Sequence, residues 1–399
     1  MRVIQVHNRY RFWLGGEDTV VDQERRLLSE RGHIVETFFS TNADLPTGSP
    51  WESISTGFRS IWSHKAYREM ISKIEIFHPD LIHIHNTFAS LSPSVIWAAK
   101  HKKVPVVLTL HNYRLICATS KLFRDGMPCE LCVDKLFWPA LIHRCRYSGS
   151  FATGFSIIAT KVIHRCLGTY RKKVDAFIVL SDFDARIMIR SGLPSERVFV
   201  KPNFLNYHPK LSNMECEEKE RRIIFVGQAI QGKGVDLLLS AWSRTEHRGY
   251  SLLIVGNSQE QKELLCQGSG EDGIYWAGHQ EREEVLRLIF GSRFLVLPSR
   301  FYEGMPMVII EALSLGIPVI VPDHGVFPFM VRESKGALFF RANDAGSLSD
   351  ALQRAIEMDE GNWSQLRRAA LHTFESRYTA ETNYKRLVEI YQYVSGLST

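Results

Sequence analysis

The chain has 399 residues, of which 45% are hydrophobic and 23% charged, and it contains seven cysteines. This balance excludes a disordered, fibrous or disulfide-stapled protein, and the length is sufficient for two domains with complete cores. The first residues hold only a short apolar run, and the uncharged stretch from Tyr147 to Thr160 is too short and too rich in Gly, Ser and Thr for a membrane span. We therefore expect a cytoplasmic protein.

The net charge of +6 is concentrated in one part of the chain. The segment from Lys100 to Lys173 has 14 Lys and Arg residues and only three acids, Asp125, Glu130 and Asp134, so it carries a net charge of +11. A concentrated basic face suits phosphates, anionic lipid or nucleic acid. A solvated surface without a partner is the alternative.

Short β-rich runs alternate with helical patterns along the whole chain. The predicted strands are Val3 to Val6, Leu81 to His85, Val106 to Leu110, Ala176 to Leu180, Ile223 to Val226, Leu252 to Val255, Phe294 to Leu297 and Pro318 to Val321. Continuous apolar strands separated by helices indicate parallel sheets covered on both faces. Two such series predict an α/β protein with two doubly wound domains, joined near Asn203 to Glu220.

Glycines follow two of the predicted strands. Gly15 and Gly16 precede the first helix, and Gly227, Gly232, Lys233 and Gly234 follow the strand Ile223 to Val226. Glycines at these positions let backbone N–H groups approach an anion, and Lys adds a positive charge. Neither stretch has the Gly-Lys-Ser/Thr order of a P-loop. Taken alone, each is a common strand-to-helix turn, for which a structural role is the usual one.

Two glutamates flank the start of a predicted helix. Glu303 lies in the loop Pro298 to Met305, whereas Glu311 lies about five residues into a helix that begins near Pro306. Between them come Gly304 and the unpaired N–H groups of the first turn, at the positive end of the helix dipole. This order of carboxylate, anion site and carboxylate matches the hexose hydroxyls, diphosphate and ribose hydroxyls of a nucleotide sugar.

The pattern Glu303-x7-Glu311 within PSRFYEGMPMVIIEALSLGIPVI resembles the signature of the retaining glycosyltransferases of family 4, which have the GT-B fold. RVIQVHN, GGEDTVVDQERRLLSERGHIV, PDLIHIHN, VPVVLTLHNYR, VLSDFD, KPNFLN, FVGQAIQGKGVDLLLSAW, LLIVGN and IYWAGH follow in the order of that family, so the likeness covers nearly the whole chain. It implies two Rossmann-like domains facing each other across a cleft. An acceptor-binding domain is expected at 1–205, with a Cys-rich basic insert at about 115–173, and a nucleotide-sugar-binding domain at 206–375. A last helix at 376–399 is expected to pack back on the first domain.

The resemblance also implies an activity: metal-independent transfer of a hexose-type sugar, with retention, from a UDP- or GDP-sugar to a hydroxyl of a glycan or lipid-linked glycan, as in bacterial polysaccharide biosynthesis. The implied catalytic residues are His111, beside the reacting sugar, Lys233, on the leaving diphosphate, and Glu303, on the donor hexose. Glu311 would bind the ribose. The implied donor-binding set is Gly15, Gly16, Gly227, Lys233, Arg300, Glu303, Gly304, Met305, Pro306 and Glu311.

The chain departs from the family pattern at two places. Gln228 stands where an Arg is usual, so one phosphate-binding charge is missing, and Arg300 is either its replacement or a solvated loop residue. The segment DHGVFPFMV replaces the usual Gly-Gly and Glu, which changes the expected local contacts with the sugar.

Four cysteines lie in the basic insert. Cys129 and Cys132 form a Cys-x2-Cys knuckle between Cys117 and Cys145, and the four thiols could bind a structural zinc or could be free thiols. No catalytic metal or other cofactor is expected, because His83, His85 and His111 fall at separate strand ends without a helical ligand spacing.

The same insert mixes Phe, Trp and Ile with Arg and Lys in LFWPALIHRCRY and SFATGFSIIATKVIHRCLGTYRKK. This mixture is typical of an interfacial helix, and it predicts peripheral contact with anionic lipid at the inner face of the cell membrane. Ordinary helices with basic outer faces are the alternative. Three other functions stay open: a GT-B-like sugar-nucleotide epimerase, a nucleic-acid-binding protein and a non-catalytic partner subunit. No nucleic acid is expected, because the aromatic residues cluster with aliphatic ones.

Overall fold

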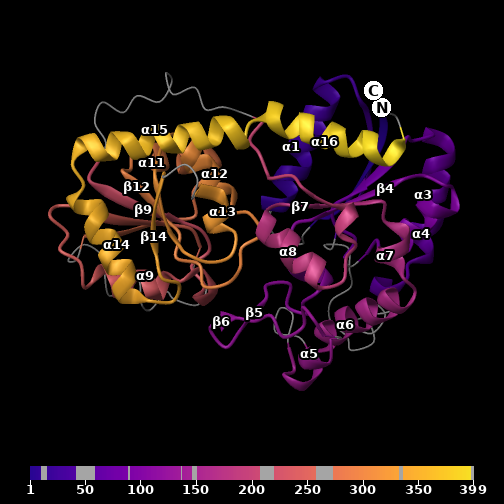
Figure 1. Cartoon of the computed structure of the whole chain (residues 1–399), viewed down its shortest axis with the longest axis horizontal. Helices are drawn as coiled ribbons and strands as arrows, with labels where there is room; N and C mark the ends of the chain where they lie inside the picture. Colours follow the sequence, from indigo (N-terminus) through magenta and orange to yellow (C-terminus); the bar gives the residue numbers. More distant parts are fainter. Residues whose placement is uncertain are drawn as a thin grey trace. The chain divides into compact units, whose positions relative to one another are not determined.

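The computed structural model describes residues 1–9, 16–41, 59–88, 90–135, 137–145, 151–206, 220–257, 273–331 and 336–396, with only the backbone described for 151–154. The chain divides into two compact units (Figure 1). The first unit comprises Met1–Leu122, Cys129–Asn206 and Ala380–Thr399, and the second comprises Phe123–Pro128 and Tyr207–Thr379.

The first unit is built on a six-stranded parallel sheet in the order β2-β1-β3-β4-β7-β8. Its strands are β1 (Arg2–Arg9), β2 (Ile34–Thr41), β3 (Leu81–Ile84), β4 (Val106–Leu110), β7 (Ala176–Val179) and β8 (Val198–Val200). The helices α1 (Gly16–Glu30), α3 (His64–Phe77), α4 (Ser94–His101), α7 (Thr169–Lys173) and α8 (Asp182–Arg190) connect them. The winding reverses at β1, so a crevice is expected at the carboxyl ends of β1 and β3.

The second unit repeats this design with the strand order β11-β10-β9-β12-β13-β14. Its strands are β9 (Arg222–Val226), β10 (Ser251–Val255), β11 (Ile274–Gly278), β12 (Phe294–Val296), β13 (Val319–Pro322) and β14 (Ala337–Phe340). Its helices are α9 (Val235–Trp242), α11 (Arg282–Phe290), α12 (Met307–Ser314), α13 (Phe327–Val331), α14 (Ala345–Glu357) and α15 (Glu360–Arg377). Here the winding reverses between β9 and β12. The loops that follow these two strands therefore meet at the place where ligands bind in such sheets.

Every strand predicted from the apolar runs is present. The sequence did not single out β2, β8, β11 or β14, whose residues are mostly half-buried and so lack a continuous apolar run. The basic insert contains a short antiparallel hairpin of β5 (Phe123–Arg124) and β6 (Met127–Pro128), together with α5 (Trp138–Ile142) and α6 (Phe151–Cys166). None of the helices that the structure describes combines the length and apolarity needed to cross a bilayer.

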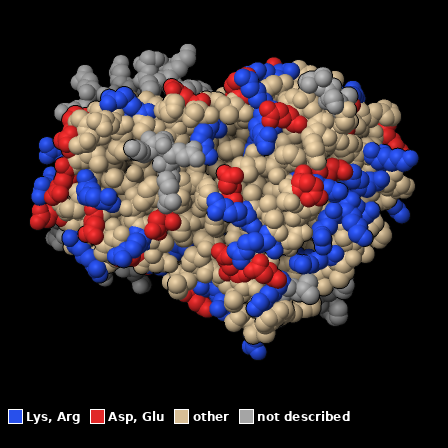
Figure 2. Space-filling model, viewed as in Figure 1, with Lys and Arg blue, Asp and Glu red and all other residues tan. Residues whose placement is uncertain are grey.

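Lys and Arg side chains gather on the first unit in the region of α4 and α7 (Figure 2). Two of them are paired, because Lys100 contacts Asp175 and Lys102 contacts Glu75. Basic side chains of the segment Lys100 to Lys173 therefore lie together on the surface of the first unit, and ion pairs with acidic side chains neutralise part of their charge.

The last helix, α16 (Ala380–Ser395), belongs to the first unit and lies against α1 (Figure 1). Its residues Leu387, Ile390 and Tyr391 share one apolar cluster with residues of β1 and β3 such as Val3 and Leu81. Burial of these large side chains fixes the helix to the sheet.

A buried ionic network also holds α16. Lys201 Nζ lies 3.0 Å from Glu24 Oε2 and 3.3 Å from Asn383 Oδ1 of α16, and the Tyr391 hydroxyl lies 2.7 Å from His83 Nδ1. Burial alone would raise the pKa of Glu24, but Lys201 and His83 outweigh it and hold this pKa well below its usual value. Glu24 is therefore ionised and depends on Lys201 as its counter-charge.

We predict that Lys201→Met strongly destabilises the first unit, because it leaves a buried carboxylate without its partner. Such a loss typically costs about 3 to 5 kcal/mol. Hydrogen exchange of β1 and β3 amides in increasing urea measures it. The control Lys65→Met removes a lysine whose side chain is 85% exposed, and it should cost less than about 1 kcal/mol.

The same network predicts how the stability of the first unit depends on pH. The folded-state pKa of Glu24 lies below the unfolded value of about 4.3. The contribution of Glu24 to the free energy of unfolding is therefore complete above about pH 4.3 and is lost as the pH falls through the folded-state pKa. In Lys201→Met this acid-sensitive part of the stability should shrink. Wild-type stability of Lys201→Met at neutral pH would contradict the role given to the pair.

Candidate active site

In the second unit, a lysine and a glutamate meet at the point where the sheet reverses its winding. Lys233 ends a short 3₁₀ turn, Gln231–Lys233, that follows β9, and Glu303 lies in the loop that follows β12. The Lys233 Nζ atom is 2.6 Å from Glu303 Oε1, and Ser299 donates a hydrogen bond to the same oxygen at 2.5 Å. The Glu303 residue is only 8% exposed, so the carboxylate is held firmly in one orientation.

Two glycines permit this close approach of the two loops. A Cβ at Gly232 would lie 2.5 Å from the Phe301 ring, and a Cβ at Gly234 would lie 2.1 Å from the Pro298 carbonyl oxygen. Gly234 also has a φ of 73°, in the left-handed region. Because Gly232 and Gly234 have no side chains, the turn that carries Lys233 can pack directly against the loop that carries Glu303.

Helix α12 starts directly after that loop. Pro306 is its N-cap residue and makes no side-chain capping bond, so no side chain of the cap occupies the N–H groups of the first turn. These groups and Gly304 lie between the two glutamates in sequence. They offer an anion the positive end of the helix dipole.

Glu311 on α12 already has a protein partner. Its Oε1 atom lies 3.2 Å from Nη2 of Arg282, the first residue of α11. Burial raises the pKa of Glu311, and Arg282 opposes that rise. Arg282 was not among the site residues predicted from the sequence. The rule that ligand-binding residues follow strand ends could have found it, since it lies just after β11.

Arg300 and His324, which were considered with the departures from the family pattern, also have protein partners. Arg300 Nη2 donates to Asp236 Oδ2 at 2.7 Å, so its charge is shared with a carboxylate of the same unit. His324, in the unusual DHG segment, lies 3.0 Å from the Ser299 carbonyl oxygen through its Nε2 atom, which supports the loop that carries Glu303. Gln228 is exposed. The N–H group of Gly227 donates a hydrogen bond to the carbonyl oxygen of Val255 in β10.

In the first unit, His111 follows β4 and contacts a second histidine. Its Nε2 atom lies 3.0 Å from His85 Nδ1. Burial lowers the pKa of both, with that of His85 at about 3, so both rings are neutral. Gly16 begins α1 and is exposed, whereas Gly15 lies outside the described residues.

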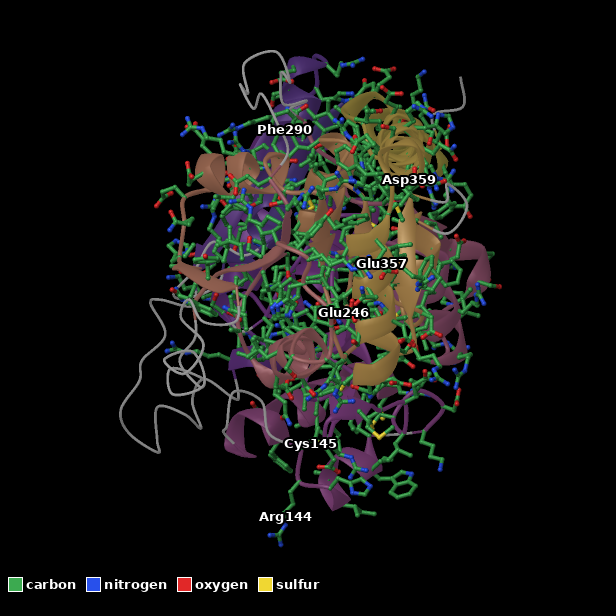
Figure 3. All side chains as sticks on the ribbon, turned by 90° about the vertical axis from the view of Figure 1, so that its left-hand side faces the viewer. Arg144, Cys145, Glu246, Phe290, Glu357 and Asp359 are labelled. Carbon is green, nitrogen blue, oxygen red and sulfur yellow. The ribbon has the colours of Figure 1, made fainter. Side chains whose placement is uncertain are left out.

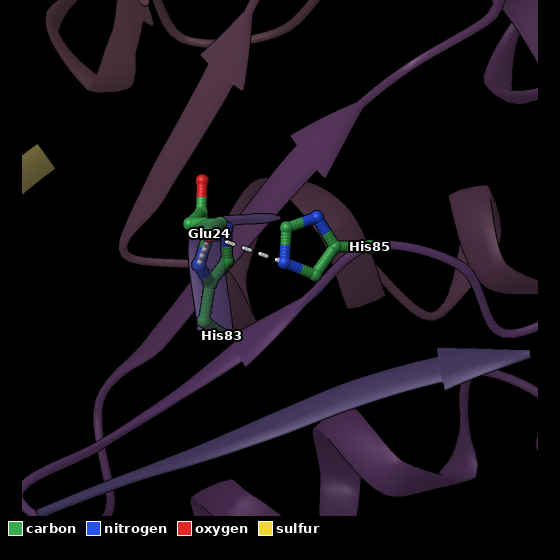
Figure 4. Close-up of side chains that lie close together, drawn as sticks. All are labelled: Glu24, His83 and His85. Atoms are coloured by element: carbon green, nitrogen blue, oxygen red, sulfur yellow. Dashed lines mark ion pairs between the residues drawn. The ribbon is translucent and has the colours of Figure 1, made fainter. Parts of the chain in front are cut away.

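His83 and His85 also approach Glu24 of α1 (Figure 4). The nearest carboxylate oxygen is 3.0 Å from His83 and 3.3 Å from His85, and these three are the one group in the described part of the chain with metal-ligand spacing. The expectation that the histidines are separated was therefore wrong. Positions two apart share one face of a strand, and α1 adds the carboxylate.

This buried group does not suit a metal ion. His83 has hydroxyl groups against both ring nitrogens, Tyr391 at 2.7 Å and Thr109 at 2.7 Å. A divalent cation bound to Glu24 would also face the ammonium of Lys201, 3.0 Å from the same carboxylate. We interpret the group as the charge-paired network described above.

The four cysteines of the insert lie in the first unit as free thiols. Cys132 and Cys145 pack against one small apolar cluster that includes Ala118, next to Cys117. Burial, with the nearby thiols of Cys117, Cys145 and Cys129, raises the pKa of Cys132 to about 11. The four thiols share one neighbourhood, but no three of their sulfur atoms lie within 4.8 Å of one another.

Comparisons with known proteins identify both units. Residues 14–208 match the model of Glycosyltransferase Family 4, and residues 212–370 match that of Glycosyl transferases group 1. The amylovoran biosynthesis glycosyltransferase AmsK of Erwinia amylovora is 24% identical over 51% of this chain and 52% of its own. This chain therefore spans about half the length of that relative.

Two further comparisons extend over most of the chain. The alpha-monoglucosyldiacylglycerol synthase of Streptococcus pneumoniae is 21% identical over 92% of this chain and 81% of its own. The crystal structure of Anabaena Alr3699/HepE with UDP and glucose aligns with a TM-score of 0.64 and 14% identity, covering 98% of both chains. With two six-stranded parallel sheets and these matches, the chain belongs to the family 4 type of glycosyltransferases and has the GT-B fold.

Proposed function

We propose that the protein is a retaining hexosyltransferase, which moves a hexose from a nucleotide diphosphate sugar to a hydroxyl of a glycan or lipid-linked glycan. The observation that carries this proposal is the contact of Lys233 with Glu303 at 2.6 Å, in the loop that leads into α12. It puts a cation against a carboxylate in the loop that leads directly to the first-turn amides of α12. The HepE neighbour, whose structure contains UDP and glucose, supports a UDP-sugar as the donor.

Each group has a chemical role in binding the donor. Lys233 and the first-turn amides of α12 would hold the diphosphate, and Glu303 would accept hydrogen bonds from hexose hydroxyls. Glu311 would accept hydrogen bonds from the ribose, which would then compete with Arg282 for the carboxylate. His111, which is neutral, would bond to the reacting sugar through a ring nitrogen without adding charge.

Transfer would proceed on one face of the sugar. The bond between the anomeric carbon and the diphosphate oxygen breaks while the acceptor oxygen bonds to the same carbon, and the acceptor proton passes to the leaving phosphate. This scheme uses no protein nucleophile. Lys233 and the helix dipole stabilise the charge that develops on the diphosphate, which is the function that a metal ion has in other enzymes.

We predict that Lys233→Met and Glu303→Gln each slow transfer about 100- to 1,000-fold, the usual effect of removing one preorganised charge-stabilising group. The two variants should differ in binding. Lys233→Met should weaken UDP binding, whereas Glu303→Gln should not weaken it, because UDP lacks the hexose and the substitution leaves Lys233 without a competing carboxylate. Calorimetry with UDP and turnover with UDP-sugars measure these effects.

Matched controls come from an exposed ion pair on α11. Arg287→Met and Glu284→Gln remove one charge each from this exposed pair and should leave turnover unchanged. Near-normal turnover in Lys233→Met or Glu303→Gln would remove that residue from the mechanism. Isomerisation of the donor without any acceptor would favour an epimerase instead.

We also propose that the first unit docks on an anionic membrane at the cytoplasmic side. On α6 the buried face includes Ile157 and Lys161, yet the opposite, exposed face is also apolar. Large exposed apolar side chains in and around α5 and α6 are Leu131, Trp138, Leu141, Ile142, Phe155, Val162, Ile163 and Leu167. Basic side chains flank them. Lys135 lies over the Trp138 ring at 5.5 Å, and Arg144 extends outward beyond α5 (Figure 3).

Sedimentation with vesicles tests this docking. Phosphatidylcholine vesicles that contain phosphatidylglycerol should carry the protein down, and pure phosphatidylcholine should do so much less. Ile142→Gln should weaken binding, because Ile142 is 65% exposed at the proposed surface. Ile76→Gln is the control, since Ile76 is 78% exposed on α3. Binding that ignores both anionic lipid and Ile142 would contradict the proposal.

A structural zinc on Cys117, Cys129, Cys132 and Cys145 stays a prediction. A cation would favour the thiolate forms that burial and mutual proximity disfavour. Elemental analysis of the purified protein should give one zinc per chain, and Cys132→Ser should lower it. Absence of zinc, with four thiols that react freely with a thiol reagent, would contradict the site.

A further inference from the structure

A cavity of about 90 Å³ lies within the first unit at the carboxyl ends of β3 and β4. Residues of the loop after β3, the end of β4, and helices α6 and α7 line it. Its wall is mostly apolar, with Ile96, Leu108 and Ile157 among the lining residues, and His111 also lines it. The position is that of a ligand site in a doubly wound sheet.

Lys161 of α6 lines this cavity although it is only 6% exposed. Its Nζ atom donates to the Cys117 carbonyl oxygen at 2.5 Å and lies 5.2 Å from the centre of the Phe137 ring. Within the described residues, no carboxylate oxygen lies within 4.0 Å of it. A buried ammonium whose described partners are a carbonyl and an aromatic ring is costly to maintain. This contrasts with Lys201, which has Glu24 at 3.0 Å.

Arg114 adds a second positive charge to the lining. Its guanidinium donates to Asn86 Oδ1 at 3.1 Å and to Ser120 Oγ at 3.3 Å, and it lies over the Phe88 ring. These contacts hold the planar group in a fixed orientation. His85 and His111 are neutral, and no Asp or Glu occurs among the described residues that line the cavity. Burial lowers the pKa of Lys161 to about 7, and the charge of Arg114 contributes to that lowering, so Arg114 supplies the permanent positive charge of this apolar cavity. An anion beside Lys161 would raise that pKa and complete the second charge.

We propose that this cavity binds a phosphate group of the acceptor, with Lys161 as its counter-ion and Arg114 as a second ligand. The proposal rests on the glycosyltransferase function proposed above, because it assigns the acceptor to the first unit. A phosphate suits the pair, since a guanidinium donates two parallel hydrogen bonds to phosphate oxygens while an ammonium supplies a compact charge. The apolar exposed face of α6 favours a lipid-linked phosphate over a soluble one.

Calorimetry in the presence of saturating UDP tests the proposal, because UDP fills the donor site and leaves the cavity free. The probes are inorganic pyrophosphate and geranyl diphosphate, a short prenyl diphosphate. Wild-type protein should bind both, and Lys161→Met should raise both dissociation constants about 10-fold or more. Lys161→Met should leave the affinity for UDP unchanged. The control Lys65→Met, which removes an exposed lysine of the same unit, should change neither.

The outcomes separate this proposal from the donor function. If wild-type protein binds UDP but pyrophosphate binds equally well to wild type and Lys161→Met, the cavity is not a phosphate site. If UDP itself fails to bind, the proposed donor function fails instead. Tighter binding of geranyl diphosphate than of pyrophosphate would show that the phosphate of the acceptor is lipid-linked. Equal binding of the two probes would support the phosphate site but contradict a lipid-linked acceptor. Arg114→Gln provides the same comparison if circular dichroism shows that Lys161→Met does not fold.

Discussion

The contact between Lys233 and Glu303 is the constraint on which the second unit's site depends. It exists because two glycines remove the side chains that would separate the loops after β9 and β12, as the 2.1 Å approach of a Cβ at Gly234 to Pro298 shows. The reversal of winding between β9 and β12 places these loops side by side. Backbone topology, glycine and charge thus act together. Without any one of them, the cation would not lie against the carboxylate.

Three lysines show how the chain uses buried positive charge. Lys201 is fully buried against Glu24 and Asn383, and this closed network joins α16 to the sheet. Lys233 is paired too, but its side chain is 20% exposed, so a ligand can reach it. Lys161 is buried beside a cavity with a carbonyl as its described hydrogen-bond partner. A structural lysine therefore differs from a ligand-binding lysine in its ion-pair or hydrogen-bond partner and in whether a ligand can reach it. Neither property follows from the residue type.

Much of this could be predicted from sequence, because the signals are local. Continuous apolar runs identified the central strands, and Gly232 and Gly234 marked the turn that carries Lys233. The sequence also placed the start of helix α12 between Glu303 and Glu311, and the anion site expected there stays a prediction. These features need only strand periodicity, turn chemistry and the polarity of a helix.

The features that were missed depend on contacts between distant segments. Arg282 is 29 residues before Glu311, so its position just after β11 marks it as a candidate but does not show that it meets Glu311 of α12. Glu24 and Lys201 are 177 positions apart, so an acidic residue on α1 was not recognisable as half of a buried pair. The separation expected for His83 and His85 was wrong for a different reason: they are two positions apart at the end of β3, and positions two apart lie on the same face of a strand.

The most direct test of the account is a crystal structure of the protein with a non-transferable UDP-hexose analogue. The account predicts that a hexose hydroxyl lies within about 3 Å of the Glu303 carboxylate and a diphosphate oxygen within about 3 Å of Lys233 Nζ. It also predicts that the ribose hydroxyls bond to Glu311. An analogue bound with the Lys233–Glu303 contact intact, and with both glutamates turned away from its sugar and ribose, would contradict it.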